Sequence, residues 1–456
     1  MIKSYETYKN SGIEWIGEIP NHWEAIKMKF IGYLFSGLSG KKGDDFKKDD
    51  SEFNHYYIPF TNIANNSIID PNRLDSVEIF ENENQNEVRK NDLLFLMSSE
   101  NYDDIGKTAL LKVELENTYL NSFCKGFRLN NQEEIDANFL NYLLSGDIYR
   151  KILSIEAKGF TRINLQMGKI QNLPVILPNT KTEQTQIANY LNHKTNLIDI
   201  IINQKEQLIE KLKEQRQAVI KETVTKGLNP IAPLKDSGIE WLGKIPEHWE
   251  LNRLFAICEL VRGNSNFKKD ELLRSGKYVA LQYGKTYKVE EVNQEFEYYV
   301  NEEFYKESQV VNYGDTIIIS TSETIEDLGH SVFYNRNDEG LLGGEQMLIR
   351  TKDNKMNPEY LFYSSKMFLT ELRRYATGIK VFRFNINDLK NTITTLPPIS
   401  EQTQIVEHIK IHNYNIENTI VRTKISIKKL KEYRQSIISE AVTGKIDVRD
   451  WKPKTT

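Results

Sequence analysis

Apolar residues recur at helical spacing along two long stretches of the chain. The first stretch contains Ile187, Leu191, Ile198, Ile202, Ile209, Leu212, Val219, Ile220 and Val224, and the second contains Ile405, Ile409, Ile416, Ile420, Ile427, Leu430, Ile437, Ile438 and Val442. Steps of three, four and seven residues place these side chains on one face of a helix. Gly227 and Gly444 are suited to end the two helices. The pattern predicts long helices over 181–227 and 400–446, each about 65 Å long. Each helix needs a partner for its apolar face, and an antiparallel pair of the two is the simplest solution.

The regions outside these stretches have a mixed pattern. Short β-rich runs such as Asp315–Ser320 alternate with helix-like runs such as Asn138–Leu144, and each region closes on a proline-flanked strand signal. We therefore predict an α+β fold with a first globular domain at 1–180 and a second, with its linker, at 228–399. A tail follows at 447–456. The N-cap candidates of the two long helices are Thr182 and Ser400.

The two halves of the chain repeat each other. Residues 11–24 return as 237–250, with the shared core Ser-Gly-Ile-Glu-Trp. The offset is 226 at this segment, 221 at Phe46 and Phe267, 223 at Asp92 and Asp315, and 218 in the long helices. The halves are thus expected to share one fold and to be related by a pseudo-two-fold axis. Two similar heads suit a ligand that is itself nearly two-fold, and duplex DNA is a common ligand of this kind.

Composition restricts the function classes. The 456 residues carry a net charge of −4, which disfavours general coating of nucleic acid but leaves room for local basic clusters. The two cysteines, Cys124 and Cys258, lie at non-equivalent places and predict neither a disulfide framework nor a metal site. The N-terminus has no signal pattern and no apolar run is long enough for a membrane span. We expect a cytoplasmic protein.

Motifs for catalysis are missing from the sequence. The glycine-rich run 37–42 has the wrong spacing for a phosphate-binding loop, and the only Pro-Pro pair, at 397–398, lacks the neighbours of an adenine-methyltransferase motif. His22 and His248 recur, but inside an apolar segment that carries tryptophan, where packing is the favoured role. We expect a protein that is not an enzyme and has no cofactor and no metal.

Three duplicated motifs together resemble a known family, the specificity subunits of type I restriction–modification systems. They are the Gly-Ile-Glu-Trp segment that opens each half, the Glu-Gln pair at 183–184 and 401–402 that opens each long helix, and the closing runs 213–225 and 431–443. The resemblance covers essentially the whole chain. It implies two target-recognition domains that each read half of a bipartite DNA sequence, helices that set the spacing, two methyltransferase subunits docked on the chain, and restriction subunits that can join.

Candidate DNA contacts fall into repeated and unmatched groups. The repeated candidates are Lys47, Lys48, Lys268 and Lys269, together with Lys380 and the pairs Arg162/Arg383 and Asn164/Asn385; the unmatched ones are Lys41, Lys42 and Arg274. Lysines neutralise phosphates, and Arg and Asn can read guanine and adenine. A solvated surface is an equal alternative for the paired lysines. Residues that recur in both halves favour scaffold or phosphate contacts over base reading, because base readers should differ, so the unmatched loops are the better base-reading candidates.

The closing runs of the long helices supply a separate set of candidates. Arg216, Gln217, Arg434 and Gln435 recur beside the apolar face, where partner docking or hydrogen bonding between the helices is favoured over DNA contact. An alternative function for the whole chain is a two-headed scaffold that binds proteins and has no DNA specificity. A steep dependence of DNA binding on salt would separate the two functions.

Overall fold

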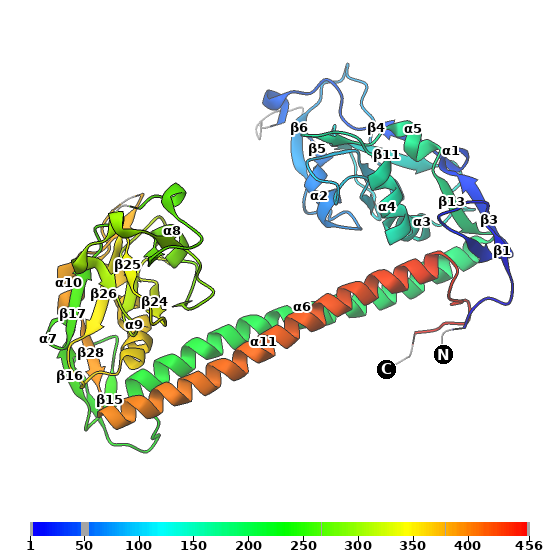
Figure 1. The fold of residues 1–456 in the computed structure, drawn as a ribbon. Helices are drawn as coiled ribbons and strands as arrows, with labels where there is room; N and C mark the ends of the chain where they lie inside the picture. The colour runs from blue at the N-terminus through cyan, green and yellow to red at the C-terminus, as the bar shows by residue number, and fades with distance from the viewer. Residues whose placement is uncertain (1–2, 47–53, 266, 379, 454–456) are drawn as a thin grey trace. The chain divides into compact units, whose positions relative to one another are not determined.

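The computed structural model describes residues 3–46, 54–265, 267–378 and 380–453. The chain forms two compact units: unit 1 comprises 1–205 and 424–456, and unit 2 comprises 206–423. Both long helices are present, α6 at Lys181–Lys226 and α11 at Ile399–Val442. Each unit therefore contains a globular part and one portion of each long helix, and Figure 1 labels the elements of both units.

Unit 1 is built on two main sheets. One is antiparallel, in the order β4 (Gly32–Ser36), β11 (Cys124–Leu129), β7 (Leu93–Leu96) and β9 (Thr108–Leu110). The other has the order β10 (Thr118–Leu120), β5 (Asn54–Ile58) and β6 (Asp75–Glu78), with β10 parallel to β5. Smaller antiparallel pairs are β1 (Tyr8–Asn10) with β2 (Glu18–Pro20), β3 (Trp23–Lys27) with β13 (Pro174–Pro178), and β8 (Ser98–Ser99) with β12 (Ile163–Asn164).

The shorter helices of unit 1 pack beside these sheets (Figure 1). They are α1 (Met28–Ile31), α2 (Phe60–Asn65), α3 (Ala137–Ser145), α4 (Asp147–Glu156) and α5 (Met167–Gln171). The side chain of Asp136 caps α3 by accepting from the backbone N–H groups of Asn138 and Phe139. Apolar residues of α3, α4, β7 and β13 share one core with the beginning of α6 and the end of α11.

Unit 2 repeats this topology and extends it. Its antiparallel sheet β17 (Cys258–Arg262), β26 (Gln346–Thr351), β22 (Thr316–Ile319) and β24 (Ser331–Tyr334) gains a parallel edge strand, β19 (Glu291–Val292). The second sheet has the order β20 (Tyr299–Val300), β18 (Tyr278–Leu281), β25 (Gly340–Leu342) and β21 (Val310–Val311), with β18 parallel to β25. The small pairs are β14 (Leu234–Asp236) with β15 (Lys244–Pro246), β16 (Glu250–Arg253) with β28 (Ile393–Leu396), and β23 (Thr321–Ser322) with β27 (Phe382–Arg383).

The shorter helices of unit 2 also follow those of unit 1. They are α7 (Leu254–Ile257), α8 (Tyr283–Thr286), α9 (Pro358–Leu372) and α10 (Ile386–Asn391). The helix α9 replaces the α3–α4 pair and is continuous; Asn357 caps it, with proline at its first position. Short 3-10 helices cover Gly43–Phe46 in unit 1 and Lys269–Glu271, Glu302–Phe304, Glu307–Gln309 and Arg373–Tyr375 in unit 2. The α+β class and the duplicated fold predicted from the sequence are confirmed.

Within each unit the two long helices run antiparallel. In unit 1, the start of α6 at Ile187 shares a core with the end of α11 at Val442. In unit 2, the end of α6 at Val224 shares a core with the start of α11 at Ile405. The predicted apolar face is thus the contact face. Gly227 and Gly444 follow the helices with φ of 74° and 72°, the left-handed conformation that glycine adopts at low cost.

The start of α6 differs from the prediction. The helix begins at Lys181, and the hydroxyl of Thr180, not that of Thr182, accepts from the backbone N–H of Glu183 at 3.4 Å. The second long helix begins at Ile399, one residue before Ser400. Across the described ranges, no helix is both long enough and apolar enough to cross a membrane.

Candidate nucleic-acid interface

The repeated opening segment of each half is bound to the first turn of a long helix. In unit 1, Trp23 donates its Nε1–H to Glu183 at 3.0 Å, and His22 Nε2 lies 2.8 Å from the other carboxylate oxygen. In unit 2, Trp249 and His248 contact Glu401 at 3.0 and 2.8 Å. Both tryptophans are fully buried. The repeated His-Trp pair and the repeated glutamate therefore hold the globular part of each unit on its long helix.

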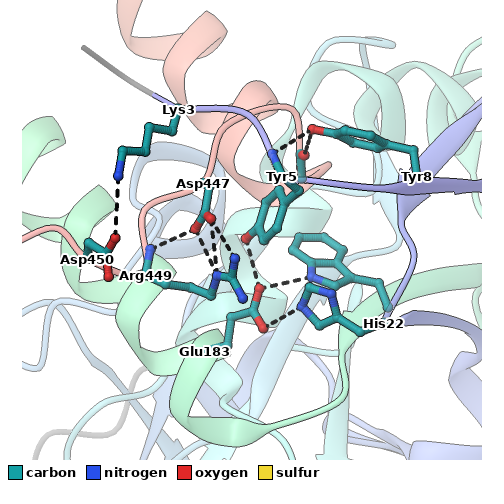
Figure 2. Close-up of polar contacts among 10 residues, drawn as sticks. Lys3, Tyr5, Tyr8, His22, Glu183, Asp447, Arg449 and Asp450 are labelled. Atoms are coloured by element: carbon teal, nitrogen blue, oxygen red, sulfur yellow. Dashed lines mark hydrogen bonds and ion pairs between the residues drawn. The ribbon is translucent and has the colours of Figure 1, made fainter.

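Unit 1 adds contacts that unit 2 does not repeat (Figure 2). The Tyr5 hydroxyl donates to Glu183 at 2.8 Å, and burial together with the Glu183 charge raises the pKa of that hydroxyl above its ordinary value. Arg449 pairs with Asp447 at 2.7 Å, and the Asp447 backbone N–H donates to the Lys3 carbonyl at 2.7 Å. Segments near the two ends of the chain thus meet beside Glu183.

The glutamine that follows each of these glutamates joins the long helix to a second element. The Gln184 side chain accepts from the Asp136 backbone N–H at 2.9 Å and donates to the Pro178 carbonyl at 3.0 Å. The Gln402 side chain makes the matching contacts with the Asn357 N–H and the Pro397 carbonyl, at 2.7 and 2.8 Å. The Glu-Gln pair is repeated because both side chains hold each globular part on its long helix.

The repeated arginines of the long helices form matching ion pairs. Arg216 lies 4.0 Å from Glu417 in unit 2, and Arg434 lies 3.0 Å from Asp199 in unit 1. Gln435 donates to the Ser145 carbonyl at the end of α3, whereas Gln217 is exposed. Arg216, Arg434 and Gln435 thus make contacts inside their own units, and Gln217 stays available to a partner.

A second pair of repeated arginines lies inside the sheets. Arg128 donates two hydrogen bonds to Asp92, of 2.8 and 2.7 Å, and Arg350 donates two to Asp315, of 2.9 and 2.6 Å. The hydrogen bonds that Arg128 donates to Asp92 raise the pKa of Arg128. These bidentate pairs join neighbouring strands and are part of the scaffold.

The lysine candidates differ in their availability. The Lys41 side chain is only 5% exposed and pairs with Glu83, and this hydrogen bond lowers the pKa of the Glu83 carboxyl. Lys42 is exposed, as are Lys268, Lys269 and Arg274 in and beside the 3-10 helix Lys269–Glu271. Lys47 and Lys48 lie outside the described residues. The ion pair of Lys41 makes it a poor candidate for reading bases.

The arginine and asparagine candidates lie in or next to a hairpin in each unit. Lys158 and Asn164 exchange backbone hydrogen bonds of 2.9 and 2.8 Å across the first hairpin, and Thr377 and Arg383 exchange bonds of 2.9 and 3.0 Å across the second. Asn164 and Arg383 belong to the strands β12 and β27, which pair antiparallel with β8 and β23. Each hairpin therefore lies at an edge made by two short strands.

The structure corrects the register predicted between these hairpins. Asn164 faces Ser98 and Arg383 faces Thr321, so the offset here is 219 and not 221. Asn164 therefore matches Arg383, and Arg162 matches Val381. The predicted recurrence of Arg162 at Arg383 and of Asn164 at Asn385 is wrong. Arg162 and Arg383 therefore need not share a scaffold role.

The remaining hairpin candidates have different environments. The Asn385 side-chain oxygen caps α10 by accepting from the N–H groups of Asn387 and Asp388 at 2.8 and 3.1 Å. Lys380 and Arg383 are exposed. Arg162 is exposed and lies over the ring of Phe123, 4.1 Å from its centroid. Phe123 is not among the residues predicted from the sequence, where its signal is an aromatic side chain that does not recur in the second half.

Other chemistry is limited within the described parts of the chain. Both cysteines are buried and free, and burial raises their pKa values. No group of three or more His, Cys, Asp or Glu side chains among these residues could hold a metal ion. The exposed cationic and aromatic side chains at the hairpins remain the arrangement best suited to nucleic acid.

Comparisons with known proteins agree on one family. Residues 20–211 and 246–429 both match the family model "Type I restriction modification DNA specificity domain". The chain is 27% identical over 447 residues to a putative type I restriction enzyme MjaX specificity subunit from Methanocaldococcus jannaschii, covering 95% of this chain and 96% of the relative.

Solved structures share the fold. A chain from a study of complex assembly and conformational transition in the type I R-M system matches with a TM-score of 0.72 and 16% identity, covering 94% of this chain and 99% of that one. The crystal structure of the HsdS subunit from Thermoanaerobacter tengcongensis matches with a TM-score of 0.55 and 15% identity, covering 94% and 98%.

Proposed function

Because the chain belongs to the type I restriction–modification DNA specificity family, we propose that each of its units reads one half of a bipartite duplex DNA target. The observation that carries this proposal is the second family match: both halves align with the DNA specificity domain, and both build the same sheets. The family is not catalytic. The chain supplies recognition, and methylation and cleavage belong to other subunits of the complex. We propose that it acts in the cytoplasm, on duplex DNA that carries the bipartite target.

Two modification subunits are the partners that this arrangement favours, with restriction subunits joining them. The same buried contacts hold the globular part of each unit on its long helix, so the surfaces around them are arranged alike in the two units. Equivalent surfaces suit two copies of one partner. A net charge of −4 further suggests that the partners share the contact with DNA phosphates.

The long helices are the proposed spacer between the two half-sites. Insertion of one heptad after Lys205 and another after Thr423 would add about 10 Å to each helix. That length corresponds to about three base pairs of duplex. The expected result is a longer gap between unchanged half-sites, measured by adenine-methylation sequencing. Altered half-site sequences would contradict the spacer role.

Co-expression with the cognate modification subunit tests the whole proposal. Genome-wide adenine-methylation sequencing should show one bipartite motif, with a methylated adenine in each half. The purified chain alone should bind DNA weakly, and binding by the complex should fall steeply as salt rises. Methylation without a sequence motif, or tight specific binding by the isolated chain, would contradict the proposed division of labour.

A further inference from the structure

The hairpins of the two units share a backbone that only glycine allows. Gly159 and Gly378 have φ of 147° and 117°, and a Cβ atom would lie 2.0 Å from the carbonyl oxygens of Arg162 and Val381. Such a contact is far shorter than any tolerated for a side chain. The same glycine and the same closing hydrogen bonds therefore place Thr161 and Arg162 of unit 1 at positions that match Lys380 and Val381 of unit 2.

The side chains on this common backbone differ between the units. Thr161 and Arg162 of unit 1 correspond to Lys380 and Val381 of unit 2 by the offset of 219. Phe123, which contacts Arg162, corresponds to Glu345 of unit 2: the Phe123 carbonyl accepts from the Met97 N–H and the Glu345 carbonyl accepts from the Ser320 N–H, at 3.0 and 3.1 Å.

Phe123 and Glu345 match by this one backbone hydrogen bond, whereas their side chains and their φ angles differ. Phe123 and Glu345 each directly precede an interior strand of their sheet, β11 and β26. Glu345 has φ of 63°, a left-handed conformation that is uncommon for a residue other than glycine. Backbone outliers of this kind concentrate at functional sites. Unit 1 thus offers a guanidinium over an aromatic ring, and unit 2 offers an aliphatic side chain and a carboxylate at the corresponding positions.

Arg162 is held in place while its donors stay available. Its guanidinium lies 4.1 Å from the Phe123 ring centroid, and the Phe60 ring lies edge-on to Phe123 at 6.5 Å. No ion pair within the described residues engages Arg162, in contrast to Arg128 and its bidentate partner. Stacking on an aromatic face fixes the plane of the guanidinium and leaves its N–H groups at the edge.

The hairpin itself is braced against the rest of unit 1. The Tyr102 hydroxyl donates to the Gly159 carbonyl at 3.3 Å. Phe160, next to that glycine, is completely exposed. An exposed aromatic side chain beside a fixed guanidinium gives the tip both an apolar contact and a directional donor.

We propose that Arg162, held on Phe123, reads a guanine in the half-site of unit 1, and that Val381 and Glu345 make the corresponding position of unit 2 read differently. This inference rests on the proposed function. An arginine that lies flat can donate two hydrogen bonds to guanine O6 and N7. The carboxylate of Glu345 would instead repel those acceptors. The two units thus share the glycine hairpin, and the residues that differ between the units set which base each hairpin reads.

The test uses the complex of the full chain with its modification subunit and compares adenine-methylation motifs. The variant R162A removes the donors and the charge, whereas R162K keeps the positive charge and removes the planar guanidinium that stacks on Phe123. F123L removes the platform. V381A is the matched control in the other unit, and R73A removes an exposed arginine elsewhere in unit 1 that pairs with Asp70. Melting temperatures within 2 °C of wild type, roughly 0.5–1 kcal/mol, show that each variant is folded.

The expected result is a loss of sequence specificity at one G·C pair in one half-site of the methylated motif. Discrimination at that pair should fall about tenfold or more in R162A and R162K, because a good bidentate contact provides about that much selectivity. F123L should give a smaller loss at the same pair. V381A should leave that half-site unchanged, and R73A should leave the whole motif unchanged.

Other outcomes overturn the inference. A loss in R162A that is uniform over all sites and is rescued by R162K would identify a phosphate contact. An unchanged motif, or relaxation in both half-sites, would also refute base reading by Arg162. These results leave the proposed function intact, because the wild-type complex would still methylate a bipartite motif. Absence of any motif in wild type would refute both.

Discussion

Replacement of Glu183 by alanine should destabilise unit 1 far more than the matching change at Glu401 destabilises unit 2. Glu183 is buried and accepts hydrogen bonds from two buried donors, the Tyr5 hydroxyl and the Trp23 indole. Glu401 is 21% exposed and accepts from one buried donor, Trp249. The half-exposed histidine beside each glutamate can turn to water.

The magnitude follows from the number of donors left without an acceptor. An unsatisfied buried donor costs about 1–3 kcal/mol. E183A leaves two donors without an acceptor, so its cost is about 2–6 kcal/mol, and E401A leaves one, so its cost is about 1–3 kcal/mol. E183Q keeps one side-chain oxygen, which can still accept from both Tyr5 and Trp23. This variant should therefore cost about 1 kcal/mol.

Amide hydrogen exchange read by mass spectrometry measures these losses separately for each unit. The slowest amides of unit 1, in β7 and β11, should lose protection in E183A, while those of β22 and β26 in unit 2 should not. E401A should show the reverse pattern with a smaller change. Equal losses in E183A and E183Q would mean that the negative charge, not the hydrogen-bond acceptor, holds the anchor. A change below about 1 kcal/mol in E183A would refute the argument from stranded donors.

Three further substitutions have expected outcomes. G159A should abolish methylation at the wild-type target while the sheets of unit 1 keep their exchange protection, because a Cβ atom would collide with the Arg162 carbonyl. D92N should lower the stability of unit 1 to urea by about 3 kcal/mol, since it leaves the partly buried Arg128 without its carboxylate. R434A should change the stability to urea by less than about 1 kcal/mol, because its ion pair is partly exposed; a loss of several kcal/mol would show a tighter bond than the structure describes.

The long helices were predictable because their signal is both periodic and duplicated. Apolar residues at matching positions over more than 40 residues leave few alternatives to a buried helical face. The sheets were not predictable at the same level. Their strands are two to six residues long, and pairing such as β10 with β5 joins segments about 60 residues apart. Local pattern carries no information on partners at that separation.

The candidate site shows the same limit. Lys41 was attractive because its loop is unmatched, but its carboxylate partner, Glu83, lies 42 residues away. The division into units was also beyond the linear pattern. The first unit takes in Lys424–Thr456 as well as the N-terminal residues, so each long helix contributes to both units. Contacts across long separations decided both features.

The predicted register between the hairpins was wrong, and the correct register shows which residues can differ in what they recognise. Two Arg-x-Asn-like matches at an offset of 221 suggested a repeated side-chain role, whereas the glycine and the closing hydrogen bonds repeat at 219. Where side chains do repeat, as in Glu183 and Glu401, they are used in contacts within the unit.

A position that reads bases must meet a different condition. Its backbone must repeat, so that both units present it to DNA in the same way, and its side chain must not, because two half-sites have to be told apart. Arg162 and Val381 meet this condition, because their hairpins share the glycine and the closing hydrogen bonds. A change at one of these positions should therefore alter one half-site alone, whereas a change at a repeated anchor should lower the stability of a whole unit.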